Sequence, residues 1–290
     1  MQVLYDLLIE PFSAPFMQRA LLEVLLLAVP GGVLGSWIVL RRLAFYTHAA
    51  GTAAFPGLVV AGPWGLPPQL TALACGLGLA GGLSGLTRTR RVDLDAAIGL
   101  GLVLALAIGV ILASDLYESG SGVDRLLFGT LIGLGTTDVW LTAGLALVAL
   151  GANVALRRPW LAGGFDPASA RSLGVRARMG DWLLLALIAL AVVAALEAVG
   201  ALLVAVIFVL PAATARLVFV RLTALQLASV GLAAAEGVAG LWLARRLDIG
   251  PGPALAMIGG ALFAVTAGMR ALPRQVAAAP SAPSAPGARA

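Results

Sequence analysis

The stretch "WLLLALIALAVVAALEAVGALLVAVIFVLPAATA", Trp182 to Ala215, carries no charged side chain except Glu197. A helix that spans a bilayer needs roughly 20 apolar residues, so this stretch is long enough for two spans or for one long distorted helix. Gly200 and Pro211 are its only helix-breaking residues. The number of membrane crossings therefore depends on how the chain behaves near Gly200.

The rest of the chain is equally apolar. Hydrophobic residues make up 60% of it and charged residues 11%, whereas soluble proteins carry about 25% charged residues. The apolar runs lack the alternation of a membrane β-barrel. The sequence predicts an all-α polytopic membrane protein with about nine transmembrane helices, or eight, in segments 17–40, 44–62, 67–87, 95–114, 136–156, 182–199, 201–217, 224–243 and 253–272.

Arginine placement favours nine spans over eight. All 19 basic residues are arginine, and nine spans with the N-terminus outside place 15 of them on the cytosolic side, against 12 for eight spans. The membrane domain is then expected at residues 17–274. Residues 1–16 look like an amphipathic extracytoplasmic lead-in, and the Pro/Ala/Ser-rich residues 275–290 like a disordered tail.

Composition also excludes several functions. The chain has no lysine, which the phosphate-binding P-loop requires, so any ATPase must be another protein. Cys75 is the only cysteine and rules out a cysteine-based metal site. The arginines are scattered over short loops, so we expect no nucleic-acid partner. One histidine outside any hydrolase motif makes a transport subunit more plausible than an enzyme.

One cytosolic loop contains a short helix signal. Asp166 is a good N-cap, Pro167 suits the first helical position, and Gly174 suits the end. This predicts a helix at about 166–174, interpreted as a docking element for a partner or, alternatively, as a connector on the lipid headgroups.

Glycines also recur at the spacing of close helix contacts. Gly31 with Gly35 and Gly78 with Gly82 are two such pairs. They predict tight packing, either within one subunit or between two.

Several motifs in a fixed order carry a family resemblance. They include "PFMQRAL" (15–21), "LRRLAF" (40–45), "FDPASARSLGV" (165–175), "LPAATAR" (210–216) and "DIGPGP" (248–253). From about Pro15 to Leu272 the chain resembles the membrane subunits of ABC importers for zinc, manganese and iron.

The resemblance implies a type II ABC importer-like helical bundle in the cytoplasmic membrane. It implies three partners: a second permease copy forming a homodimer, an extracytoplasmic metal-binding protein, and a cytosolic ABC ATPase. No permanently bound cofactor is expected, since the divalent metal is cargo. The implied ATPase-docking residues are Phe165, Asp166, Pro167, Ala170, Arg171, Leu173 and Gly174.

The only histidine, His48, lies in "LRRLAFYTHAAGTAAFPG" (40–57). Family members usually carry an aspartate here and a histidine four residues later. Aligned on the flanking "AF" and "PG", this chain has His48 at the aspartate position and Thr52 at the histidine position. The two share one helix face, and two copies would offer two imidazoles and two hydroxyls.

Imidazole suits zinc better than manganese, so zinc is the favoured cargo, followed by manganese or iron. The alternatives are that His48 is a neutral membrane histidine bonded to a neighbouring helix, or a contact for a non-metal substrate.

Carboxylates at membrane depth are further candidates, because they are costly there and usually functional. Glu236 and Glu197 are tentative members of the metal pathway, with interfacial solvation as the alternative for Glu197 and for Glu23. Asp95 and Asp138 are interpreted as helix-start or headgroup contacts. The competing functions are an ABC permease for a non-metal or chelated solute, and a gradient-driven transporter in which Glu197 and Glu236 relay protons.

Overall fold

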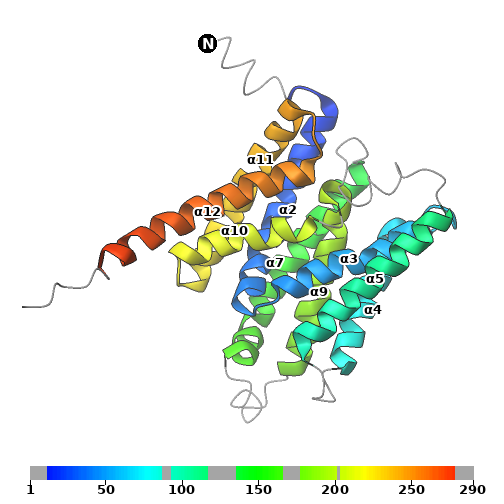
Figure 1. Cartoon of the computed structure of the whole chain (residues 1–290), viewed down its shortest axis with the longest axis horizontal. Coiled ribbons are helices and arrows are strands. Elements are labelled where there is room, and N and C mark those ends of the chain that lie inside the picture. Colours follow the sequence, from blue (N-terminus) through cyan, green and yellow to red (C-terminus); the bar gives the residue numbers. More distant parts are fainter. Residues whose placement is uncertain (1–11, 87–92, 117–134, 166–176, 201–202, 278–290) are drawn as a thin grey trace, which may run out of the picture.

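The computed structural model describes residues 12–86, 93–116, 135–165, 177–200 and 203–277 (Figure 1). These residues form nine α-helices and, within the described ranges, no strand. The helices are α2 (Pro15–Leu40), α3 (Ala44–Ala61), α4 (Pro68–Leu86), α5 (Leu94–Leu116), α7 (Thr136–Phe165), α9 (Ala177–Val199), α10 (Val204–Val218), α11 (Leu222–Leu247) and α12 (Pro251–Ala277).

Every predicted apolar segment corresponds to one of these helices, so the all-α polytopic fold is confirmed. Six helices are long and apolar enough to cross a membrane by length and composition, while α4 and α10 provide shorter apolar helices and α3 is not among the six. The nine helices are therefore established for the described residues. Nine crossings remain a prediction.

The helical run between Trp182 and Ala215, which the sequence allowed to be one helix or two, is interrupted near Gly200. α9 ends at Val199, and Gly200 adopts a φ of 90°, a conformation that glycine reaches without steric cost. The amide N–H of Gly200 still bonds to the carbonyl of Leu196 at 2.7 Å, and α10 begins four residues later at Val204. The sixth and seventh segments are thus two separate helices.

The helices form two groups joined through α2 and α7 (Figure 1). In the first group α2 packs against α10 and α11, and α12 covers α10 and α11. In the second group α3 packs against α4, α5 and α9, and α4 packs against α9. α7 contacts α2 on one side and α9 on the other.

Glycines allow the closest approaches within the first group. A Cβ atom at Gly35 would lie 2.1 Å from the carbonyl oxygen of Phe208 in α10, and one at Gly31 would lie 3.2 Å from that of Ile207. The Gly31/Gly35 pair is therefore a contact inside one subunit. A Cβ atom at Gly78 or Gly82 would meet no described atom within 4 Å beyond its own helix backbone.

A buried polar network ties α2, α7 and α11 together. The indole N–H of Trp37 and the amide of Gln226 both donate to Asn153 Oδ1 at 2.8 Å. Nearby along the same helices, the Ser36 hydroxyl lies 3.3 Å from that of Ser229. Hydrogen bonds of this kind replace water that the bilayer cannot supply.

Some boundaries differ from the prediction. α7 continues nine residues past the predicted end at 156, carrying Arg157 and Arg158 as helical residues. Charge ends a hydrophobic run but not a helix, because arginine is a good helix former. α12 likewise extends to Ala277, three residues beyond the predicted domain end at 274, and residues 278–290 lie outside the described ranges.

Candidate functional site

The corner between α2 and α3 fixes where the candidate site begins. Arg42 adopts the left-handed conformation with a φ of 57°, and the amide N–H of Leu43 bonds to the carbonyl of Ile38 at 2.8 Å. This six-to-one bond is the helix-ending pattern that usually has glycine at the left-handed position. Thr47 N–H bonds back to the Leu43 carbonyl at 2.9 Å. Only three residues therefore separate the end of α2 from the start of α3.

α3 is buried along most of its surface, with one uncovered stripe. Ala44, His48, Pro56 and Val60, which are four or eight residues apart, keep exposed surface, and we call these four residues the open stripe of α3. Apart from the exposed Phe45, every other residue of α3 is buried. Because residues four apart lie above one another on a helix, the four residues share one face, which is interrupted at position 52, where Thr52 is buried.

His48 is the only polar member of the open stripe, and it is half-buried. Thr52 lies one turn further on but is only 1% exposed, and its hydroxyl donates to the His48 carbonyl at 3.1 Å. The predicted pair therefore does share a face. Within one chain, however, the imidazole is the accessible ligand, and the threonine oxygen offers only its lone pairs.

The neighbouring polar residues have structural roles. The Tyr46 hydroxyl donates to the Leu185 carbonyl of α9 at 3.0 Å, and the Thr47 hydroxyl donates to the Leu43 carbonyl at 2.9 Å. Both side chains are buried. The Tyr46 bond ties α3 to α9, whereas the Thr47 bond stays within its own turn of the chain.

Glu236 occupies a different part of the fold. It is 4% exposed, and its Oε1 atom has no hydrogen-bond partner among the described residues. A Cβ atom at Gly259 of α12 would lie 2.9 Å from Glu236 Oε2 and 3.0 Å from the Leu210 side chain of α10. Glu236 is therefore enclosed where α10, α11 and α12 meet.

The predicted metal-pathway residues do not form one cluster in a single chain. α11, which carries Glu236, packs against α2, α10 and α12, whereas α3 packs mainly against α4, α5 and α9. No group of three His, Cys, Asp or Glu side chains suited to a metal occurs in the described part of the chain. Glu197 lies in the last turn of α9, and its side chain is outside the described residues.

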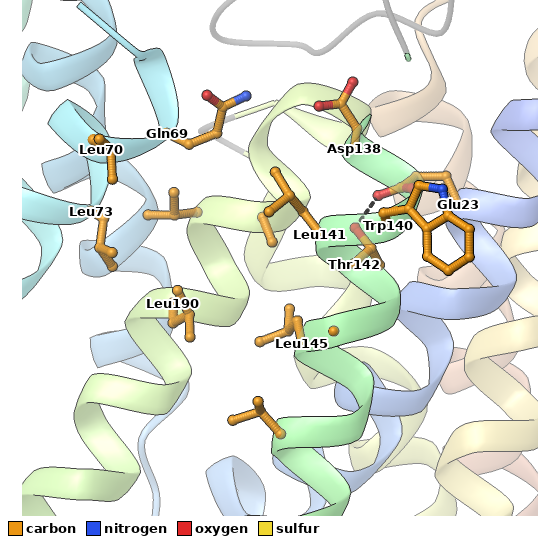
Figure 2. A pocket seen from close by; sticks show the side chains of 14 residues that line it. Glu23, Gln69, Leu70, Leu73, Asp138, Trp140, Leu141, Thr142, Leu145 and Leu190 are labelled. Atoms are coloured by element: carbon orange, nitrogen blue, oxygen red, sulfur yellow. Dashed lines mark hydrogen bonds between the residues drawn. The ribbon is translucent and has the colours of Figure 1, made fainter. Parts of the chain in front are cut away.

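Glu23 belongs to a separate apolar cavity of about 420 Å³. The Thr142 hydroxyl donates to Glu23 Oε1 at 2.5 Å, and leucines of α4, α7 and α9 line the cavity (Figure 2). Interfacial solvation is thus wrong for Glu23, which is 1% exposed. Nothing in the sequence pairs it with Thr142, since hydropathy does not indicate which helices touch.

Asp138, at the same cavity, is a helix-start residue as predicted. Its Oδ2 atom accepts the backbone N–H of Gly135 at 2.8 Å at the beginning of α7. Asp95 lies in the first turn of α5, where a negative charge favours the helix dipole.

The predicted ATPase-docking helix, at about 166–174, lies within residues 166–176, which are outside the described ranges. Phe165 is the last residue of α7, and α9 begins at Ala177. The structure therefore places the two helices that lead into and out of the predicted dock.

A bundle of apolar helices, six of which are long and apolar enough to cross a bilayer, is typical of a multi-pass membrane protein. The chain belongs to the ABC 3 transport family, which matches residues 13–270. This confirms the resemblance drawn from the motifs and places the chain in the cytoplasmic membrane.

Individual relatives agree with that assignment. The chain is 31% identical over 253 residues to "Manganese transport system membrane protein MntC" of Halalkalibacterium halodurans, covering 87% of each chain. It is 28% identical to "Chelated iron transport system membrane protein YfeD" of Yersinia pestis, covering 91% of this chain and 89% of that one. Among solved structures, PsaBC from Streptococcus pneumoniae in complex with Fab matches with a TM-score of 0.81 and 25% identity, over 92% of this chain and 95% of that chain.

Proposed function

We propose that this chain is the permease subunit of an ABC importer for a divalent transition metal, and that His48 contacts the metal as it crosses the membrane. The observation that carries the proposal is the open stripe of α3. A helix otherwise largely enclosed by its neighbours is partly exposed along one face, and the only histidine of the chain lies on that face. The relatives named for manganese and chelated iron transport support a metal cargo.

The proposed transporter requires further subunits. ATP hydrolysis belongs to a separate ATPase, because the chain has no lysine for a P-loop, and the segment 165–174 is the proposed dock. We further propose a homodimer, in which two copies of the open stripe face a shared pathway, supplied by an extracytoplasmic metal-binding protein. In that dimer each imidazole gains a second donor that one chain does not hold.

Donor chemistry orders the candidate metals. A pair of imidazoles favours zinc, and then iron(II), over manganese, which prefers carboxylate oxygen. The family's aspartate is replaced by His48, so we propose that zinc is moved in preference to manganese and iron. Glu236 is proposed as a second station, since a buried carboxylate with an oxygen lacking a partner is stabilised by a passing cation.

The test is uptake of zinc, iron(II) and manganese into vesicles that contain the permease, its ATPase and its binding protein. His48→Ala is expected to lower zinc uptake at least about tenfold, because losing even an outer-shell partner of a metal ligand typically costs about 10- to 100-fold. Thr47→Ala is the control, because Thr47 is adjacent in sequence but buried against its own helix. Equal zinc uptake by His48→Ala and the wild type refutes the metal-contact role.

A chelate is the second candidate cargo, because one relative is named for chelated iron transport. The same vesicles distinguish it. Uptake of an iron chelate without uptake of any free ion would keep the ABC permease assignment and replace the cargo.

A further inference from the structure

One side-chain cluster at the predicted cytosolic end of the bundle is not part of the proposed metal pathway. Its centre is Arg41, the C-cap residue directly after α2. The Arg41 guanidinium donates to the Trp160 carbonyl of α7 at 2.8 Å and to Asp181 Oδ1 of α9 at 2.5 Å. One side chain therefore joins three helices.

Aromatic and glycine contacts enclose this cluster. Trp160 is fully buried, and its indole N–H donates to the Gly180 carbonyl at 2.8 Å. Its ring meets that of Trp37 edge to face, with centroids 5.3 Å apart. A Cβ atom at Gly164 would lie 2.6 Å from Arg41 Cδ, so the guanidinium stem fills the space beside α7.

The cluster lies between two functional parts of the chain. On one side, Trp160 and Asp181 belong to the end of α7 and the start of α9, the helices on either side of the proposed ATPase dock. On the other side, the α2–α3 corner places the first residue of α3 three positions after Arg41. His48 follows one turn into α3.

The corner is short and hydrogen-bonded on both sides. The Leu43 N–H bonds to the Ile38 carbonyl and the Thr47 N–H to the Leu43 carbonyl, so no long loop separates α3 from α2. A second connection links α3 directly to α9, since the Tyr46 hydroxyl of α3 donates to the Leu185 carbonyl of α9. A shift of the inner ends of α7 and α9 is thereby passed to α3.

From these contacts we infer that Arg41 is a positioning residue that couples the ATPase-docking helices to the helix bearing His48. The inference rests on the proposed function. Arginine suits this task because its planar fork reaches two acceptors at once, whereas a lysine presents a single point charge. The exposed fraction of the side chain is 15% for Arg41 and 41% for Asp181, so water competes mainly at the Asp181 end.

The test measures ATP hydrolysis and metal uptake in the same vesicles and reports metal moved per ATP hydrolysed. Arg41→Gln is expected to keep ATP hydrolysis but lower this ratio about tenfold, the effect of losing one charge-assisted hydrogen bond. Arg41→Lys should restore the ratio only in part. Arg42→Gln is the matched control, because Arg42 is the adjacent arginine and is exposed.

A purely structural role would lower the amount of complex and leave the ratio unchanged. If Arg41→Gln does not assemble, Asp181→Asn removes the charge of the exposed acceptor while the Trp160 contact remains, and a drop of about threefold in the ratio is expected. A wild-type ratio in the assembled variant overturns the inference. If instead the wild-type complex moves no metal with ATP, the proposed function fails, and the Arg41 role fails with it.

Discussion

Replacing Gly35 by alanine tests whether α2 and α10 are packed as closely as the structure shows. The new Cβ atom would lie 2.1 Å from the Phe208 carbonyl oxygen and 3.2 Å from the Cβ atom of Ala212. The first distance is far inside van der Waals contact and involves backbone, which no side-chain rotation can move away. α10 must therefore move away from α2 by about 1.3 Å or more to restore an ordinary carbon–oxygen separation.

The free energy can be bounded from two opposing effects. Overpacking of this kind destabilises by about 1–3 kcal/mol. Replacing glycine by alanine inside a helix stabilises the helix by about 1 kcal/mol. The net expectation for Gly35→Ala is a loss of up to about 2 kcal/mol in the free energy of unfolding, because the backbone clash outweighs the gain in helix propensity.

Gly78→Ala is the matched control. Gly78 is also inside a helix, but its new Cβ atom would meet no described atom within 4 Å, so only the gain of up to about 1 kcal/mol remains. Unfolding of both purified variants is followed by denaturing-detergent titration. Equal stability of Gly35→Ala and Gly78→Ala would refute the close packing of α2 on α10.

Three further results are expected. Asn153→Ala should lower the free energy of unfolding by about 1–3 kcal/mol, because it leaves the Trp37 and Gln226 donors unsatisfied in the core; an unchanged unfolding midpoint would exclude the network. Gly200→Ala should destabilise by about 1 kcal/mol or more, since its φ of 90° is strained for any residue with a Cβ atom, while Gly231→Ala, an exposed helical glycine, should not. Glu236→Gln should keep or raise stability, because an ionisable group is costly to bury, while lowering metal uptake; uptake equal to that of the wild type would remove Glu236 from the proposed pathway.

The sequence predicts the helices well because hydropathy reports directly on the bilayer. It places the start of α3 at residue 44, as observed, and identifies Gly200 as the point of choice. What it misses at α7 has a physical reason, since Arg157 and Arg158 end the apolar run while the backbone bonds continue.

The candidate site was harder to predict. His48 is the only histidine of the chain, which made it a candidate ligand, and the structure places it on the partly exposed face of α3. The burial of Thr52 and the separation of Glu236 from α3 depend on which helices pack together. The contacts of Arg41 and Asn153 depend on it too, and helix periodicity cannot pair one helix with another.

The α2–α3 corner also sets the rotation of the site. Successive residues of an α-helix turn by about 100° around its axis, so one residue inserted or deleted between Arg41 and Ala44 would rotate all of α3 by that angle. His48 would then face the packed interior, and a buried alanine or threonine would replace it on the uncovered side. Substitutions in the corner change its stability, but a change in its length alters which side chain faces the proposed pathway, so the proposed role of His48 requires this corner to keep its length.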